Sequence, residues 1–170
     1  MIALIASALL TACRAQIPAE VELSGRVILR NRRGIVQCEY PYQLKRRNGK
    51  TDLKVDPEAL KVTDVTADDL ELKYLWWDEI DEPDPRDGET VNGQVCTIIN
   101  LKKDDRLVKI WVDKKTGALM QAEELKNGEP VRRLWGTRLK KFGERWMANV
   151  IEVETLGSGH RTKITVETLK

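Results

Sequence analysis

Apolar and polar residues alternate along the segment from Glu20 to Arg30, with the apolar positions starting at Val21. A period of two residues is typical of a β-strand that buries one face and exposes the other to solvent. The alternation resumes from Val36 to Leu44, which predicts a second strand. Pro41 interrupts that strand and indicates an edge position or a bulge, because proline cannot donate a backbone hydrogen bond.

Turn signals separate further elements along the chain. Asn48-Gly49 predicts a tight hairpin, because both central residues of such a turn need a positive φ. Thr66, which is followed by acidic residues, predicts the start of a short helix or turn over residues 67–75. The other predicted strands are residues 95–101, 107–112, 119–125, 131–140, 145–155 and 162–169, with turns such as Asn127-Gly128 between them.

These elements predict a mainly β protein with little helix, in which one antiparallel sheet curls round its own interior. A sheet of this size must curl, close or pack against a second layer, and the sequence has no long helical period to supply one. The chain has 170 residues, of which 41% are hydrophobic, and this is enough for a real core in one domain. We expect residues 20–170 to form that single domain.

The segment before the first strand has a different composition. Residues 1–12 carry no charge and are almost entirely apolar or small, which suits the hydrophobic part of a signal peptide. Leu10-Thr11-Ala12-Cys13 resembles a lipobox, in which the cysteine is lipidated and becomes the new N-terminus. We therefore expect residues 1–13 to be a signal peptide, Cys13 to be the site of lipid attachment and residues 14–19 to be a linker. Ordinary cleavage after Ala15 is the alternative.

Charge and residue types narrow the classes of function. The 29 basic and 27 acidic residues are interleaved, so we expect no nucleic-acid partner. The chain has one histidine, His160, and no Cys-X-X-Cys pair, so we expect no metal site. His160 has no nucleophile motif to partner it and is interpreted as a surface turn residue, which leaves no candidate catalytic residue. The acidic run over residues 78–89 is interpreted as a solvated loop.

Cysteines and large apolar residues give two further expectations. If Cys13 carries lipid, Cys38 and Cys96 remain and can form a disulfide in an oxidising periplasm, while two buried free thiols are the alternative. Large apolar residues on several predicted strands can line a concave surface that accepts acyl chains, with a plain packed core as the alternative. These candidates are Trp76, Trp77, Trp111, Leu119, Met120, Trp135, Trp146, Met147 and Ile151.

Several short segments follow one another in a recognisable order. The segment from Lys109 to Leu119 contains a Trp, an Asp, a Thr-Gly turn and then a Leu, and it is the most distinctive of them. The others are residues 69–77, 91–96, 127–128, 131–134, 143–147 and 161–164. Together they resemble the outer membrane lipoprotein-sorting protein family, which contains relatives of the LolA and LolB lipoprotein carriers. The resemblance extends over residues 21–170.

The resemblance implies a curved antiparallel sheet that forms an incomplete (half) β-barrel of the lipoprotein-carrier type, with an apolar hollow that binds acyl chains. It implies no catalytic residue and no cofactor, so we expect the protein not to be an enzyme. Carriers of this type have a helix between the signal peptide and the first strand, and helices that cover the hollow. Only residues 14–19 separate Cys13 from Glu20, so we expect that first helix to be missing and the lid to be poorly represented.

The leading functional hypothesis is an outer membrane lipoprotein that faces the periplasm, is anchored to the membrane through Cys13 and carries lipid or the acyl part of a lipoprotein. A soluble periplasmic protein is the alternative for the location. The alternative for the function is a structural or protein-interaction module of the cell envelope with a fully packed core. Such a module would recruit an envelope protein, of unknown identity, through an exposed edge strand.

Overall fold

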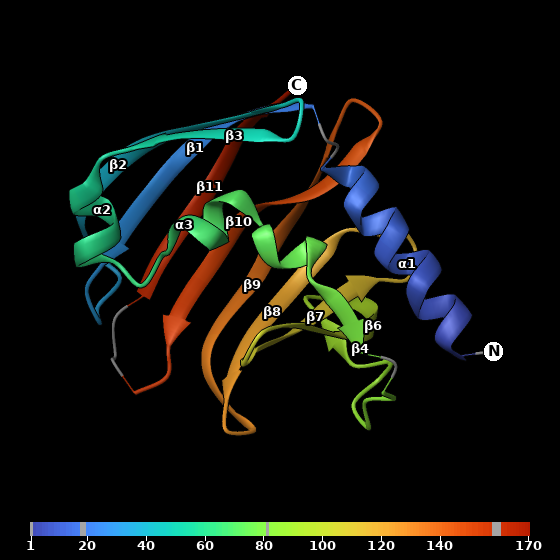
Figure 1. Ribbon diagram of the computed structural model, residues 1–170. Helices are drawn as coiled ribbons and strands as arrows, with labels where there is room; N and C mark the ends of the chain where they lie inside the picture. The colour runs from blue at the N-terminus through green and yellow to red at the C-terminus, as the bar shows by residue number, and fades with distance from the viewer. Residues whose placement is uncertain (1, 18–19, 81, 158–160) are drawn as a thin grey trace.

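One antiparallel sheet makes up most of the molecule (Figure 1). The structure is a computed structural model that describes residues 2–17, 20–80, 82–157 and 161–170. Within these residues the strand order is β3-β2-β1-β11-β10-β9-β8-β7-β6-β4, and β5 pairs with β6 beside this path. The strands are β1 (Val21–Arg30), β2 (Val36–Arg47), β3 (Lys50–Val55), β4 (Asp78–Ile80), β5 (Thr90–Val91), β6 (Gln94–Lys103), β7 (Arg106–Asp113), β8 (Leu119–Lys126), β9 (Glu129–Phe142), β10 (Arg145–Thr155) and β11 (Arg161–Leu169).

Most neighbours in the sheet are also neighbours in the sequence, as in a meander. From β6 to β11 each strand pairs with the next, and β11 then pairs with β1. This last pairing places Arg30 opposite Arg161, so the β1–β2 and β10–β11 hairpins turn at the same end of the sheet. The mainly β fold class and the strands predicted from residue 95 onwards are confirmed.

The turns form where the sequence predicts them. Asn48 and Gly49 have φ angles of 52° and 71°, and Asn127 and Gly128 have φ angles of 51° and 80°. Both central residues therefore adopt the left-handed conformation that a tight hairpin requires. Val55, at the end of β3, pairs with the residue after Pro41. The part of β2 that carries Pro41 consequently has a partner strand only on the β1 side, as predicted for an edge.

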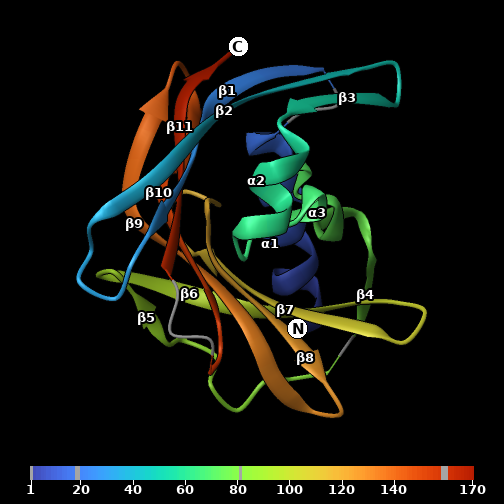
Figure 2. The same cartoon turned by 90° about the vertical axis from the view of Figure 1, so that its left-hand side faces the viewer.

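The helical elements all lie on the concave side of the sheet. They are α1 (Ile2–Gln16), α2 (Pro57–Val62), α3 (Ala67–Glu71) and the 3₁₀ helix η1 (Lys73–Trp76). Figure 2 shows the sheet curving around them, while β3 and β4 remain separate as its two edges. The sheet is therefore an incomplete barrel whose hollow holds the helices. The helix or turn predicted over residues 67–75 corresponds to α3 and η1.

A helix does precede the first strand, and it is formed mostly by the segment expected to be the signal peptide. Residues 2–16 form α1, which buries Leu10, Cys13 and the following residue Ile17 against the sheet. These three residues are three and four positions apart, which places them on one helix face. The uniformly apolar composition of the segment conceals this period in the sequence. Among the described residues, no helix has the length and apolar character needed to cross a membrane.

Two hydrophobic clusters occupy opposite faces of the sheet. The inner cluster lies on the concave side and joins residues of the helices to residues of β1, β2 and β6 to β11. The outer cluster lies on the convex side and is built around Trp111. Consecutive strand residues point to opposite faces, so Ile110 belongs to the inner cluster and Trp111 to the outer one.

Gly25 permits a close approach between three strands of the sheet. It lies at an irregularity in the pairing of β1 with β11, and Tyr42 of β2 is its cross-strand partner. The Tyr42 hydroxyl donates a hydrogen bond of 3.2 Å to the carbonyl oxygen of Thr165, over the space that a side chain at residue 25 would need. A Cβ atom added to Gly25 would lie 1.7 Å from that same oxygen.

The substitution Gly25→Ala tests this packing. The clash is with backbone, which cannot move aside, so we expect the free energy of unfolding to fall by at least about 2 kcal/mol. Gln43→Ala, at an exposed position of β2, should change it by less than about 0.5 kcal/mol. Chemical denaturation monitored by circular dichroism measures both. Equal stability of the two variants would show that the three strands are not so closely packed.

A lid-covered concave face as the candidate functional site

The concave face of the sheet is an apolar wall built by residues of neighbouring strands. Cross-strand pairing aligns one row of side chains over five strands, from β6 to β10. The row is Ile99, Ile110, Ala122, Leu134 and Val153, each paired with the next. None of them is more than 6% exposed. Because the strand period is two, residues two positions away on each strand extend the wall to both sides.

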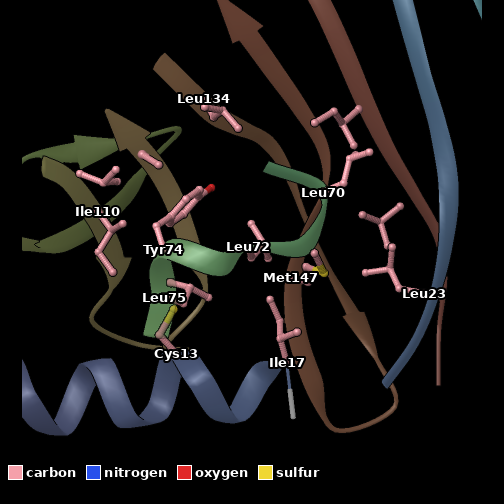
Figure 3. Packing of buried hydrophobic residues seen from close by; sticks show 14 of the residues in the cluster. Cys13, Ile17, Leu23, Leu70, Leu72, Tyr74, Leu75, Ile110, Leu134 and Met147 are labelled. Carbon is pink, nitrogen blue, oxygen red and sulfur yellow. The ribbon is translucent and has the colours of Figure 1, made fainter. Parts of the chain in front are cut away.

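The wall is covered by residues 66–77, which contain α3 and η1 and which we call the lid. The lid residues that enter the inner cluster are Leu70, Leu72, Tyr74, Leu75 and Trp77. Figure 3 shows Leu72, Tyr74 and Leu75 between α1 and the strands of the wall. The lid therefore supplies apolar side chains to the hollow, where they take the place of a second protein layer.

Local sequence explains how the lid bends. α3 begins with a capping box, in which Thr66 Oγ1 accepts a hydrogen bond from the Asp69 amide and the Asp69 carboxylate accepts one from the Thr66 amide. Leu72 ends α3 in the left-handed conformation, with φ 52° and ψ 38°. This conformation costs a residue with a Cβ about 1 kcal/mol. The resulting bend lets both α3 and η1 face the wall.

Two arginines hold the lid by its backbone carbonyl groups. Arg14 of α1 donates hydrogen bonds to the carbonyl oxygens of Leu75, at 2.6 Å, and Trp77, at 3.3 Å. Arg46 of β2 donates one of 2.6 Å to the carbonyl oxygen of Glu71, and its guanidinium lies 4.5 Å from the centre of the Trp76 ring. Burial lowers the pKa of Arg46, against the opposing effect of the nearby Glu71 carboxylate.

Two further arginines hold the lid by its acidic side chains. Arg106 of β7 forms a 3.0 Å ion pair with Asp68 and lies over the Trp77 ring at 4.8 Å. Arg132 of β9 forms a 2.5 Å ion pair with Asp69, a carboxylate that is only 5% exposed. Burial raises the pKa of Asp69, while the Arg132 charge and its hydrogen bonds oppose the shift. The lid is thus attached by arginine contacts, several of them buried, and by apolar contacts with the wall.

The packing under the lid is close but incomplete. Two small cavities of about 20 Å³ each lie between the lid and the wall. Both are lined by Leu72, Leu119 and Ile151. The Tyr74 hydroxyl is buried nearby with no hydrogen-bond partner among the described residues, and burial raises its pKa well above the ordinary value. Each cavity has room for about one water molecule, so an acyl chain enters this face only if the lid moves.

The structure separates the sequence-predicted binding residues into three groups. Trp77, Leu119, Met147 and Ile151 belong to the inner cluster or pack against it. Trp76 lies at the rim and is 43% exposed. The remaining candidates belong to the outer cluster or pack against it, and they are Trp111, Met120, Trp135 and Trp146. Neighbouring strand residues point to opposite faces, so the pairs Leu119–Met120 and Trp146–Met147 are divided between the two clusters. Both members of each pair nevertheless line one of the small cavities.

The outer cluster is covered by the loop after β4. The Arg86 guanidinium lies 4.9 Å from the centre of the Trp111 ring and pairs with Glu123. Asp84 forms a 2.5 Å ion pair with Lys109, and its side chain is fully buried. The interpretation of residues 78–89 as a solvated loop is therefore wrong for its first part, which forms β4, and for Asp84, which joins a buried ion-pair network.

The four arginines that hold the lid were not predicted as functional, although the sequence contains a signal for two of them. Arg46 continues the inward alternation of Tyr42 and Leu44 on β2, and Arg132 is two positions from the inward Leu134 on β9. A charged residue at an inward position of an amphipathic strand indicates a buried polar contact. The sequence does not identify the partner, because the lid lies far away along the chain.

The three cysteines are free. Six strands separate β2, which carries Cys38, from β6, which carries Cys96. A disulfide needs Cα atoms within about 7 Å, so the Cys38–Cys96 bond considered in the sequence analysis is not formed here. Figure 3 shows the Cys13 sulfur directed from α1 toward Leu75 of the lid.

His160 lies outside the described residues, and within them no group of histidine, cysteine and acidic side chains is arranged to hold a metal ion.

Comparisons with known proteins agree with this architecture. A family model described as an uncharacterized protein matches residues 58–170. No curated protein matches the chain in sequence. Among solved structures, the chain is similar to a DUF1329 family protein from Desulfovibrio piger, with a TM-score of 0.67, 17% sequence identity and coverage of 97% of this chain and 91% of that chain.

Two other solved structures share this fold. A LolA superfamily protein from Nitrosomonas europaea has a TM-score of 0.69, 13% identity and coverage of 97% of this chain and 92% of that chain. An outer membrane lipoprotein-sorting protein domain from Vibrio parahaemolyticus has a TM-score of 0.61, 14% identity and coverage of 99% and 91%, respectively. At these identities the likeness establishes a shared fold.

Thiol labelling tests whether α1 is docked against the lid. Cys13 and Cys96 are at most 1% exposed, and burial raises the pKa of each to about 12. Cys38 is partly exposed. We expect a maleimide at pH 8 to modify only Cys38 in the folded full-length chain, and all three thiols in denaturant. Mass spectrometry of the digested protein measures this, and rapid modification of Cys13 in the folded chain would show that α1 is not docked.

Proposed function

Because the chain belongs to the uncharacterized protein family whose model matches residues 58–170 and has the fold of the LolA superfamily, we propose that it is an exported, non-enzymatic carrier of lipid or lipoprotein acyl chains. The proposed binding surface is the apolar wall under the lid. One observation supports this proposal most strongly. The lid, a short segment held by arginine contacts, covers an apolar wall that spans five strands.

Displacing the lid exchanges one apolar cover for another. Leu70, Leu72 and Leu75 leave the wall and an acyl chain takes their place, so the area removed from water changes little. The arginine contacts, of which those of Arg46 and Asp69 are buried, are lost, and water solvates the charged groups that are freed. The left-handed conformation of Leu72 is released in the same step. A hydrocarbon ligand therefore lowers the free-energy cost of opening, because it covers the wall that the lid leaves.

The N-terminal segment supports a proposal about export and anchoring. We propose that residues 1–12 are removed and that Cys13 becomes a lipidated N-terminus, which anchors the protein to the outer membrane facing the periplasm. In the full chain Cys13 and Leu10 belong to the inner cluster. Cleavage would remove Leu10, and anchoring would take Cys13 out of the hollow. The hollow would then be less covered, so processing would also prepare the site for its ligand. A soluble periplasmic protein cleaved after Ala15 is the alternative.

One observation favours a second function. The hollow is filled by side chains of the lid and α1, apart from cavities of about 20 Å³, as in a module with a fully packed core. The edge strand β3 would then recruit an envelope protein by strand addition. The two functions differ in their requirement for lipid.

A pair of substitutions on β10 separates the two functions. Ile151 lines both cavities, whereas its neighbour Val150 lies outside the inner cluster. Ile151→Asn places an amide on the wall, so we expect the Kd for a dansyl-labelled fatty acid to rise by roughly tenfold or more. Val150→Asn should leave the Kd unchanged. Fluorescence titration measures both, with circular dichroism to confirm folding. A wild-type protein that binds no fatty acid, or equal effects of the two variants, would favour the packed module.

The mass of the protein purified from the cell envelope tests the anchor. We expect a chain that begins at Cys13 and carries two or three acyl groups. A chain that begins at Gln16 without lipid would establish the soluble form, and an unprocessed chain would show that α1 is a permanent part of the hollow. Intact-mass spectrometry distinguishes these forms, and Cys13→Ser is the control, because it should remove the acyl mass.

A further inference from the structure

The end of the sheet where the β1–β2 and β10–β11 hairpins turn exposes apolar side chains that the rest of the surface mostly hides. Ile35 is 59% exposed, Val36 is 50% exposed, and Leu156 of the neighbouring hairpin is 38% exposed. The pairing of Arg30 with Arg161 brings the two turns together, and Figure 1 shows them at one end of the sheet. We call residues 31–36, 156 and 161 the hairpin end.

The β1–β2 turn is held in a fixed shape that presents these side chains. The Asn31 side-chain oxygen accepts hydrogen bonds from the amides of Arg33, at 2.9 Å, and Ile35, at 3.0 Å. The Asn31 amide in turn donates to the Ile35 carbonyl oxygen at 3.0 Å. The exposure of Ile35 and Val36 is therefore built into an ordered turn.

The hairpin end carries positive charges that are not paired with acidic side chains. Arg32, Arg33 and Arg161 are exposed, and within the described part of the chain none of them forms an ion pair. Farther along the same strands the arginines are paired, since Arg26 contacts Glu39 and Glu167, and Arg30 contacts Glu152. The change from paired to unpaired arginines coincides with the exposed aliphatic residues.

Unpaired guanidinium groups beside exposed aliphatic side chains match the interface of an anionic bilayer. Guanidinium groups bind lipid phosphates through paired hydrogen bonds, and the aliphatic side chains enter the acyl boundary below them. The geometry points to the hairpin end as a docking surface for membranes that contain anionic phospholipid. This role goes beyond the proposed acyl carriage, and it is independent of an anchor at Cys13.

The docking surface adjoins the base of the lid. The Asp64 carboxylate, just before the lid, accepts a hydrogen bond from the Thr155 hydroxyl, and the Asp64 amide donates to Thr162. Thr155 and Thr162 flank the β10–β11 turn. Docking at the hairpin end would therefore place the bilayer next to the chain that leads into the lid.

Vesicle flotation with the full-length chain tests this surface. We expect binding to vesicles of phosphatidylglycerol and phosphatidylcholine, weaker binding at high salt and none to phosphatidylcholine alone. The double variant Arg32→Gln/Arg33→Gln should bind roughly thirtyfold more weakly, and Ile35→Ser/Val36→Ser roughly tenfold more weakly. The matched control is Arg47→Gln/Lys50→Gln, which removes two exposed charges around the hairpin turn at the other end of β2. Val95→Ser, at a residue 49% exposed elsewhere, is the apolar control.

Retained binding by both controls, with loss in both hairpin-end variants, supports the proposal. Absence of wild-type binding, unchanged binding by the hairpin-end variants, or equal loss in the controls would overturn it. Fatty-acid binding measured without vesicles should be unaffected by Arg32→Gln/Arg33→Gln. This readout distinguishes failure of membrane docking from failure of the acyl carrier.

Discussion

The rest of the structure depends on keeping water away from the apolar wall on the concave face. The lid and α1 cover this wall. The row from Ile99 to Val153 spans five strands that curve in one direction. A strongly curved sheet cannot pack flat against a second sheet, so its concave side is filled by short helices. Burial of apolar area at about 25 cal/mol per Å² makes this contact the main source of stability. The lid and α1 are the elements that complete it, and neither has a hydrophobic core of its own.

Polar contacts decide where the lid is held. Arg14, Arg46, Arg106 and Arg132 come from four different elements, and all of them reach the lid or its acidic residues. Arg106 is substantially exposed, whereas Arg46 and the Asp69 carboxylate are buried; the side chains that the lid adds to the inner cluster are apolar. A cover that presents apolar side chains to the wall can be exchanged for a hydrocarbon chain. On the convex side, Asp84 and Glu123 likewise fix a loop over Trp111 through ion pairs with buried carboxylates.

Local patterns in the sequence predicted the strands, because a period of two and Asn-Gly turns depend only on neighbouring residues. α1 was missed because residues 1–12 are apolar on every side. Candidate binding residues were assigned to one surface although alternation divides them between two. Irregular pairing near Trp111 and around Val150 also changes which residues point to which face of the sheet. No local sequence pattern reveals these irregularities. The arginine contacts with the lid join residues up to 63 positions apart, so the sequence contains the charges but not their pairing.

Hydrogen exchange of the lid with and without a bound fatty acid is the most direct test of this account. If an acyl chain takes the place of the lid side chains, the amides of residues 67–77 should exchange faster at saturating fatty acid. The amides of β6 to β10 should then exchange at unchanged or lower rates. Unchanged or slower exchange in the lid of a fatty-acid-saturated protein would contradict the account, because it would mean that the ligand binds elsewhere and that the wall remains covered.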